Sequence, residues 1–184
     1  MQAEFFLITP PAADARRLTA ALESALASTA VSALLLRRGD LPENAYKALA
    51  KAVVPLVQAA GTAVLIEGDP GLVRLLGADG LHVTGDARAV KDAVAALKPG
   101  LIVGTGNIAS RDDAMQRGEL GVDYILFGPI SGAIPETARD MARWWAETME
   151  IPSVLSDPEA TAANYDAEGC EFIGLQLAVA EPAV

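Results

Sequence analysis

The chain has 184 residues, of which 52% are hydrophobic and 5% aromatic, and its net charge is −10. This length and composition predict one domain, residues 1–184, with an aliphatic core. An acidic chain without a basic stripe argues against a nucleic-acid partner, and no run of about 18 apolar residues indicates a membrane span. Cys170 is the only cysteine and no signal-peptide pattern is present, so we expect a cytoplasmic location.

Short apolar segments alternate with amphipathic segments along the chain. The apolar segments predict eight strands, at residues 4–9, 32–38, 63–67, 80–84, 101–104, 124–127, 153–155 and 172–177. The other segments predict seven helices, at residues 14–26, 41–61, 70–76, 87–97, 110–118 and 136–149 and from residue 157 onward. Pro55 is expected to kink or break the second helix. Asp157-Pro158 is expected to start the seventh helix, with Asp as its cap.

A short phrase recurs where a helix stops and a strand starts. It reads Gly77-Ala78-Asp79-Gly80, then Gly121-Val122-Asp123-Tyr124, and more loosely Gly169-Cys170-Glu171-Phe172. Glycine suits the left-handed residue that closes a helix, and an apolar strand follows each time. The recurrence indicates a chain that is built from similar structural units.

Eight alternating strands and helices predict an α/β fold with a parallel sheet, and the number of units favours a (β/α)₈ TIM barrel. An open doubly wound sheet is the alternative, although no Gly-x-Gly-x-x-Gly follows the first strand. Residues 178–184 are too few for a normal eighth helix, so we expect a short barrel with that helix reduced or missing. The apolar flank left beside the first and eighth strands leads us to expect a homo-oligomer, with Trp144 or Trp145 of a partner subunit covering it.

Ligands of parallel barrels bind at the carboxyl ends of the strands, so polar residues that follow the strands form the candidate site. Arg37 and Arg38 are the best candidates to hold a small phosphorylated or anionic molecule, because a guanidinium matches phosphate and carboxylate. One of two adjacent strand residues faces inward, and an ion pair with Asp40 or Glu43 is the competing interpretation. Further candidates to contact the substrate are Thr105, Asn107 and Ser131.

Three carboxylates follow the third and fourth strands, and together they suggest a metal site. Glu67, Asp69 and Asp86 with water would suit Mg²⁺, which prefers oxygen ligands. The competing interpretation is that Asp69 and Asp86 cap the helices that follow them. His82 is a candidate general acid or base, because histidine titrates near neutral pH, and a hydrogen-bonded structural histidine is the alternative. Cys170 at a strand start is expected to be inert core.

The segments 77–83 (GADGLHV), 34–37 (LLLR) and 121–129 (GVDYILFGP) resemble those of thiamine phosphate synthases and the TenI-type proteins. The resemblance extends from Glu4 to about Leu177 and implies a (β/α)₈ barrel. The family joins a hydroxymethylpyrimidine diphosphate to a thiazole phosphate with Mg²⁺ and releases diphosphate. The resemblance places Arg37 on the family arginine after the second strand, and Asp86 near the second metal-binding aspartate.

Several family positions carry different residues in this chain. The glutamine before the arginine is Leu35, the following lysine is Gly39, and the Asn-Asp-Arg triplet reads Glu67-Gly68-Asp69. Residues 106–109 lack the family histidine, residues 130–134 lack the lysine, and residues 156–159 replace a Gly-Gly phosphate loop with Ser-Asp-Pro-Glu. Proline has no N–H and the acids repel phosphate, so diphosphate affinity is expected to fall. Two hypotheses follow: a diverged thiamine phosphate synthase, or a non-catalytic barrel (a pseudoenzyme) that binds a small molecule or a protein. A different reaction on the same scaffold, with Glu67, His82 and Asp86, is a third alternative.

Overall fold

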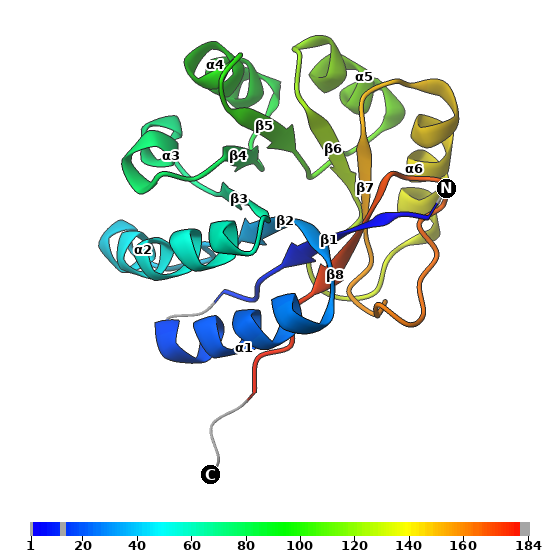
Figure 1. Ribbon diagram of the computed structural model, residues 1–184. Helices are drawn as coiled ribbons and strands as arrows, with labels where there is room; N and C mark the ends of the chain where they lie inside the picture. Colours follow the sequence, from blue (N-terminus) through cyan, green and yellow to red (C-terminus); the bar gives the residue numbers. More distant parts are fainter. Residues whose placement is uncertain (1, 12–13, 181–184) are drawn as a thin grey trace.

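The computed structural model describes residues 2–11 and 14–180 and shows eight parallel strands closed into a barrel (Figure 1). The strands follow chain order around the barrel, and β1 pairs with β8 to close it. They are β1 (Glu4–Ile8), β2 (Val31–Leu36), β3 (Ala63–Ile66), β4 (Gly80–Val83), β5 (Ile102–Thr105), β6 (Tyr124–Phe127), β7 (Ser153–Ser156) and β8 (Phe172–Gln176). The predicted (β/α)₈ barrel is therefore confirmed, and the open sheet is not formed.

Helices surround the barrel on the outside (Figure 1). They are α1 (Ala15–Ser28), α2 (Glu43–Ala59), α3 (Pro70–Leu76), α4 (Ala87–Leu97), α5 (Arg111–Glu119) and α6 (Glu136–Thr148). Helix α2 continues through Pro55, so this proline does not divide it in two. In the part of the chain that the structure describes, no helix is long and apolar enough to cross a membrane.

The predicted seventh helix is wrong, because turns connect β7 to β8. Asp157 does not cap a helix, although its side chain accepts a hydrogen bond from the Glu159 N–H at 3.1 Å. Its own backbone N–H donates to the Gly174 oxygen of β8, and its carboxylate pairs with Arg139 of α6. These contacts join residue 157 to β8 and α6, so the chain turns at the point where a helix would start.

The flank beside β8 and β1 lacks an eighth helix as far as residue 180, in agreement with the sequence-based expectation. An apolar groove of about 600 Å³ lies there, between α1, β8 and the turns after β7. Figure 1 shows turns and no helix on this side of the barrel, between α6 and α1. Residues 181–184 lie outside the described residues.

The recurring acidic residue of the sequence repeat ties neighbouring strands together. Each acid accepts a hydrogen bond from a backbone N–H of the preceding strand, and the pairs are Asp79 with Val64 at 2.7 Å, Asp123 with Val103 at 2.8 Å and Glu171 with Ser153 at 2.8 Å. The glycine two residues before each acid has a φ of +67°, +87° or +85°. In all three copies the repeat sets the start of two strands, and in the first two copies its glycine also ends a helix, α3 or α5.

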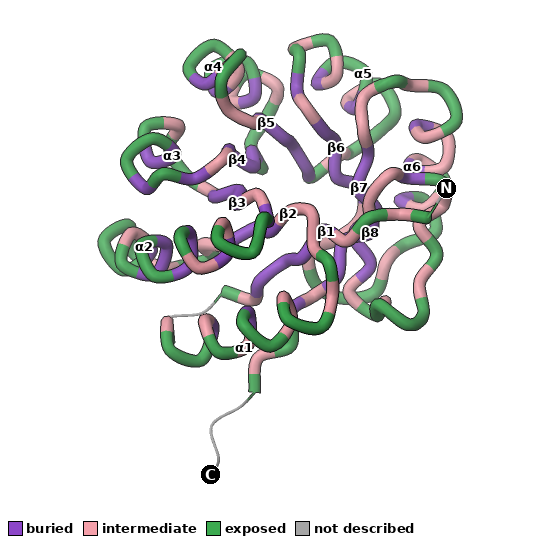
Figure 2. The backbone as a smooth tube through the Cα atoms, in the orientation of Figure 1, coloured by how far each residue is buried: buried purple, intermediate pink, exposed green. Residues whose placement is uncertain are grey.

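Two apolar clusters make the core. The larger cluster lies between strands and helices and includes Leu34, Val57 and Trp145. The smaller cluster lies inside the barrel and includes Phe6, Leu35 and Tyr124, because strand side chains alternate between the two faces. Figure 2 shows the strands mostly buried and the outer helix faces exposed.

Candidate functional site at the barrel mouth

A hollow of about 480 Å³ lies at the carboxyl ends of β2 to β6, where barrel ligands bind. Its wall comes from the loops after these five strands. The residues that line it are Arg37, Gly39, Asp40, Glu67, Thr84, Asn107, Gly128, Pro129, Ile130 and Ser131. The structure thus brings together one cation, two carboxylates and several short polar side chains.

Arg37 is the cation of this hollow. Its Nε lies 3.8 Å from Glu67 Oε1, and the two side chains are 22% and 14% exposed. Among the described residues, no acceptor lies within hydrogen-bond distance of that Nε. That Nε is buried, but the Arg37 side chain is partly exposed and lines the hollow, so the rest of its guanidinium is suited to bind an anion.

Arg38 points to a different place, as the alternation of strand residues predicts. Its Nε donates to the Leu41 oxygen at 3.0 Å, and it lines an adjoining hollow of about 360 Å³. Its backbone N–H donates to Glu67 Oε2 at 2.7 Å. The ion pair considered with Asp40 or Glu43 is not formed, because Arg37 pairs with Glu67 instead.

The three carboxylates suggested as magnesium ligands do not gather. Asp69 accepts the Gly71 N–H at 2.8 Å and Asp86 accepts the Ala89 N–H at 3.0 Å, so both cap helices. Only Glu67 of the three lines the mouth hollow. Within residues 2–11 and 14–180, no group of three His, Cys, Asp or Glu side chains is arranged to hold a metal ion. The carboxylates as placed therefore do not fit a shared Mg²⁺ site.

The three smaller polar candidates separate into two groups. Asn107 and Ser131 line the mouth hollow, as expected for contacts with a substrate. Asn107 has a φ of +59°, and its amide lies 3.3 Å from the Thr84 oxygen. Thr105 is fully buried and turned toward α5, where its Oγ1 accepts from Arg117 at 2.9 Å and donates to the Val83 oxygen. The substrate contact predicted for Thr105 is therefore not supported by its position.

His82 lies inside the barrel and does not line the mouth hollow. Its Nδ1 shares a hydrogen bond of 2.7 Å with the Tyr124 hydroxyl. Burial, together with the nearby charge of Arg37, lowers the pKa of His82 to about 4. The imidazole is neutral at pH 7, and this placement favours the structural interpretation over the catalytic one.

Glycines make room for this buried pair. A Cβ on Gly104 would lie 2.0 Å from the Tyr124 ring, and a Cβ on Gly106 would lie 2.9 Å from His82 Nε2. Tyr124 was missed as a partner of His82 because the two residues are 42 positions apart. The period-two alternation of strand residues places Tyr124 and Leu126 on the inner face of the barrel, and this pattern is the sequence signal that predicts a contact between Tyr124 and His82.

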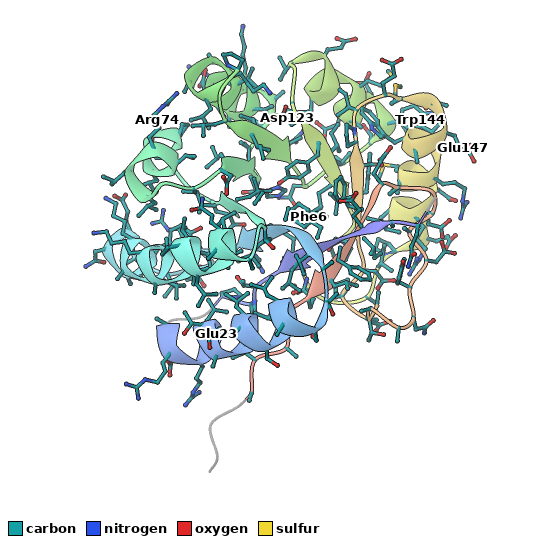
Figure 3. The ribbon with its side chains drawn as sticks, viewed as in Figure 1. Phe6, Glu23, Arg74, Asp123, Trp144 and Glu147 are labelled. Atoms are coloured by element: carbon teal, nitrogen blue, oxygen red, sulfur yellow. The ribbon has the colours of Figure 1, made fainter. Side chains whose placement is uncertain are left out.

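Two other expectations concern residues outside the mouth. Cys170 is buried, and burial raises the pKa of its thiol to about 11, so it is inert core as expected. Trp145 is 1% exposed and donates to the Ile151 oxygen, which excludes it as a surface contact. Trp144, which Figure 3 labels, is half-buried, and the Arg111 guanidinium lies 4.8 Å from the centroid of its ring.

Comparisons with known proteins agree with the barrel and its sequence motifs. Residues 5–156 match the TMP-TENI family model, described as thiamine monophosphate synthase. A thiamine-phosphate synthase of Rhodospirillum centenum is 36% identical over 154 residues, covering 81% of this chain and 74% of the relative. One from Hyphomonas neptunium is 34% identical over 187 residues, covering 95% and 84%. A thiamine phosphate pyrophosphorylase structure from Pyrococcus furiosus shares the fold, with a TM-score of 0.74 at 18% identity, covering 94% of this chain and 85% of that one.

Proposed function

This chain belongs to the TMP-TENI family of thiamine monophosphate synthases, and on that premise we propose that it acts in thiamine metabolism by binding a small phosphorylated molecule at the barrel mouth. Arg37 beside the hollow is the observation that carries the proposal. Its Nε is buried and faces Glu67 at 3.8 Å, while the side chain as a whole is 22% exposed and lines the hollow. Asn107 and Ser131 complete the polar lining on the opposite loops.

We further propose that this binding occurs without the synthase reaction. The carboxylates Asp69 and Asp86 cap helices, so they are not free to hold the metal of a diphosphate. The loop after β7 has its polar groups engaged internally, since the Asp157 N–H donates to Gly174 and the Ser156 hydroxyl donates to the Pro129 oxygen at 2.6 Å. A phosphate at that loop would find no free backbone N–H on Asp157. These contacts support a pseudoenzyme more than a synthase.

Calorimetric titration tests the binding. Hydroxymethylpyrimidine diphosphate and thiamine phosphate are titrated separately, each with and without Mg²⁺. We expect one of the two to bind without needing Mg²⁺, and the Arg37→Gln variant to bind it about ten- to a hundredfold more weakly, because a charged hydrogen bond contributes about 1.5–3 kcal/mol. Arg38→Gln is the matched control, since the neighbouring arginine is turned to Leu41 and its loss should have a much smaller effect.

A synthase assay with hydroxymethylpyrimidine diphosphate and thiazole phosphate separates the two hypotheses. Binding with no formation of thiamine phosphate supports the proposed pseudoenzyme. Mg²⁺-dependent turnover that Glu67→Gln abolishes would contradict it and would assign the metal to a rearranged mouth. If neither compound binds, the assignment of this hollow to thiamine metabolism fails.

A further inference from the structure

The opposite end of the barrel contains a second cavity, of about 290 Å³, at the amino ends of the strands. Most barrel interiors are filled there by bulky side chains. In this chain Ala33 of β2 and Ala63 of β3 stand side by side in the strand register. Both line the cavity together with Phe6, Ile102 and Phe172, and their small methyl groups leave space that larger side chains would fill.

The inner part of the cavity is apolar and aromatic. Phe6 and Tyr124 both line it, and their rings lie 5.4 Å apart. The Tyr124 hydroxyl is already bonded to His82, so the tyrosine offers the cavity only its ring. An apolar cavity of about 150 Å³ is large enough to take up benzene, and this one is nearly twice that size. It therefore has room for one ring with a short chain.

The entrance to the cavity is acidic. Glu4 and Asp123 line it, and Asp123 is paired with Lys98 while its other oxygen accepts the Val103 N–H (Figure 3 labels Phe6 and Asp123). The Glu4 carboxylate accepts a hydrogen bond from Ser32, and no Lys, Arg or His of the described residues lies within ion-pair distance of it. The charge at this entrance therefore favours a cation.

We propose that this cavity is a binding site for a small molecule made of one apolar ring and a protonated amine. The ring lies against Phe6 and Tyr124 in the space left by Ala33 and Ala63, and the ammonium group lies beside Glu4. The site is separate from the site proposed for an anion at the mouth, because the two hollows lie at opposite ends of the barrel and share no lining residue.

Three probes of the same shape test the charge preference. The protein is titrated by calorimetry with 2-phenylethylamine, 2-phenylethanol and phenylacetate at pH 7. We expect the amine to bind several-fold more tightly than the alcohol, and the acid to bind most weakly. Glu4→Gln should reduce the advantage of the amine about two- to fivefold and leave the alcohol unchanged, as expected for a solvent-exposed ion pair. Equal binding of amine and acid would overturn the proposal.

Filling the cavity tests the location. Ala33→Leu adds a side chain where the ring would lie, so it should abolish binding of the amine. Ala21→Leu is the matched control, because Ala21 lines the groove beside α1 and its change should leave binding intact. Arg37→Gln at the mouth should also leave it intact. If Ala33→Leu does not fold, Ala63→Leu serves the same test. Amine binding that survives in a folded variant with a filled cavity would overturn the proposal. The absence of binding of any probe to the wild-type protein would also overturn it.

Discussion

His82 is the chain's single histidine, and at the scale of the residue its burial makes the stability of the protein depend on pH. Its pKa is lowered to about 4 in the folded protein, against about 6.5 in an unfolded chain. Between these values the unfolded state binds more protons, so the free energy of unfolding falls as the pH falls from about 6.5 to about 4. The total loss is on the order of 3 kcal/mol. Urea denaturation at half-unit pH steps measures it.

His82→Phe is the variant that isolates this effect. It removes the titrating group while keeping an aromatic ring in the barrel, so the part of the pH dependence between 4 and 6.5 should disappear. The acidic residues give both proteins a common background at lower pH. A variant that loses stability as steeply as the wild type over this range would show that other groups cause the decline.

The carboxylates of the sequence repeat determine stability at the scale of the secondary-structure element. Asp79 accepts a hydrogen bond from a backbone N–H near the start of β3, and Asp123 accepts one near the start of β5. Asp79→Ala and Asp123→Ala each leave that N–H without its partner. Each change should lower the free energy of unfolding by about 1–3 kcal/mol. Chemical denaturation measures the loss.

Asp112→Ala provides the control for these two variants. Asp112 lies on the exposed surface of α5 and accepts only from Gln116, so its removal should change stability by less than about 0.5 kcal/mol. If all three alanine variants lose the same free energy, the repeated acids have no special role at the strand starts.

The same repeat explains why the fold was predictable from the sequence. The glycine, the acid and the apolar residues of the repeat are close together in the chain, so their pattern can be recognised in the sequence. The strands that follow them lie where this pattern predicts. The absence of the predicted seventh helix could not be seen in the sequence. The turn that replaces it depends on contacts of Asp157 with Arg139 and Gly174, which are distant in the chain. The mouth was predicted in part. Alternation separates Arg37 from Arg38, and the helix caps Asp69 and Asp86, the competing interpretation of the sequence, are confirmed. The contact of Thr105 with Arg117 appears only in the assembled barrel.

The open flank between α6 and α1 concerns the whole molecule. Its groove beside α1 is lined by small apolar residues such as Ala21 and Ala25, at the place where an eighth helix would lie. A homo-oligomer in which a second copy covers this groove remains our prediction. Light scattering over a range of concentrations tests it: Ala25→Glu should shift the mass to that of the monomer, and a wild-type protein that is monomeric throughout would contradict it.

Two arginines of α6 bind the turns between β7 and β8, on the other side of the same flank. Arg139 contacts Asp157 at 2.6 Å and Glu168 at 3.9 Å, and Asp157 is only 9% exposed. Arg139→Met leaves a buried carboxylate without its cation, so we expect the free energy of unfolding to fall by about 1.5–3 kcal/mol. Hydrogen exchange should become faster in β7 and β8, because the turns that connect them lose their link to α6.

Arg143→Met is the comparison that makes this test specific. Arg143 also binds Glu168, at 2.7 Å, but its side chain is 43% exposed, so water replaces much of the contact and the loss should be smaller. Adding Asp157→Asn to Arg139→Met should restore part of the stability, since the buried charge is then removed together with its partner. Equal losses in the two single variants, with no recovery in the double variant, would contradict this prediction. Apolar packing, and not the ion pair between Arg139 and Asp157, would then stabilise the flank that lacks a helix.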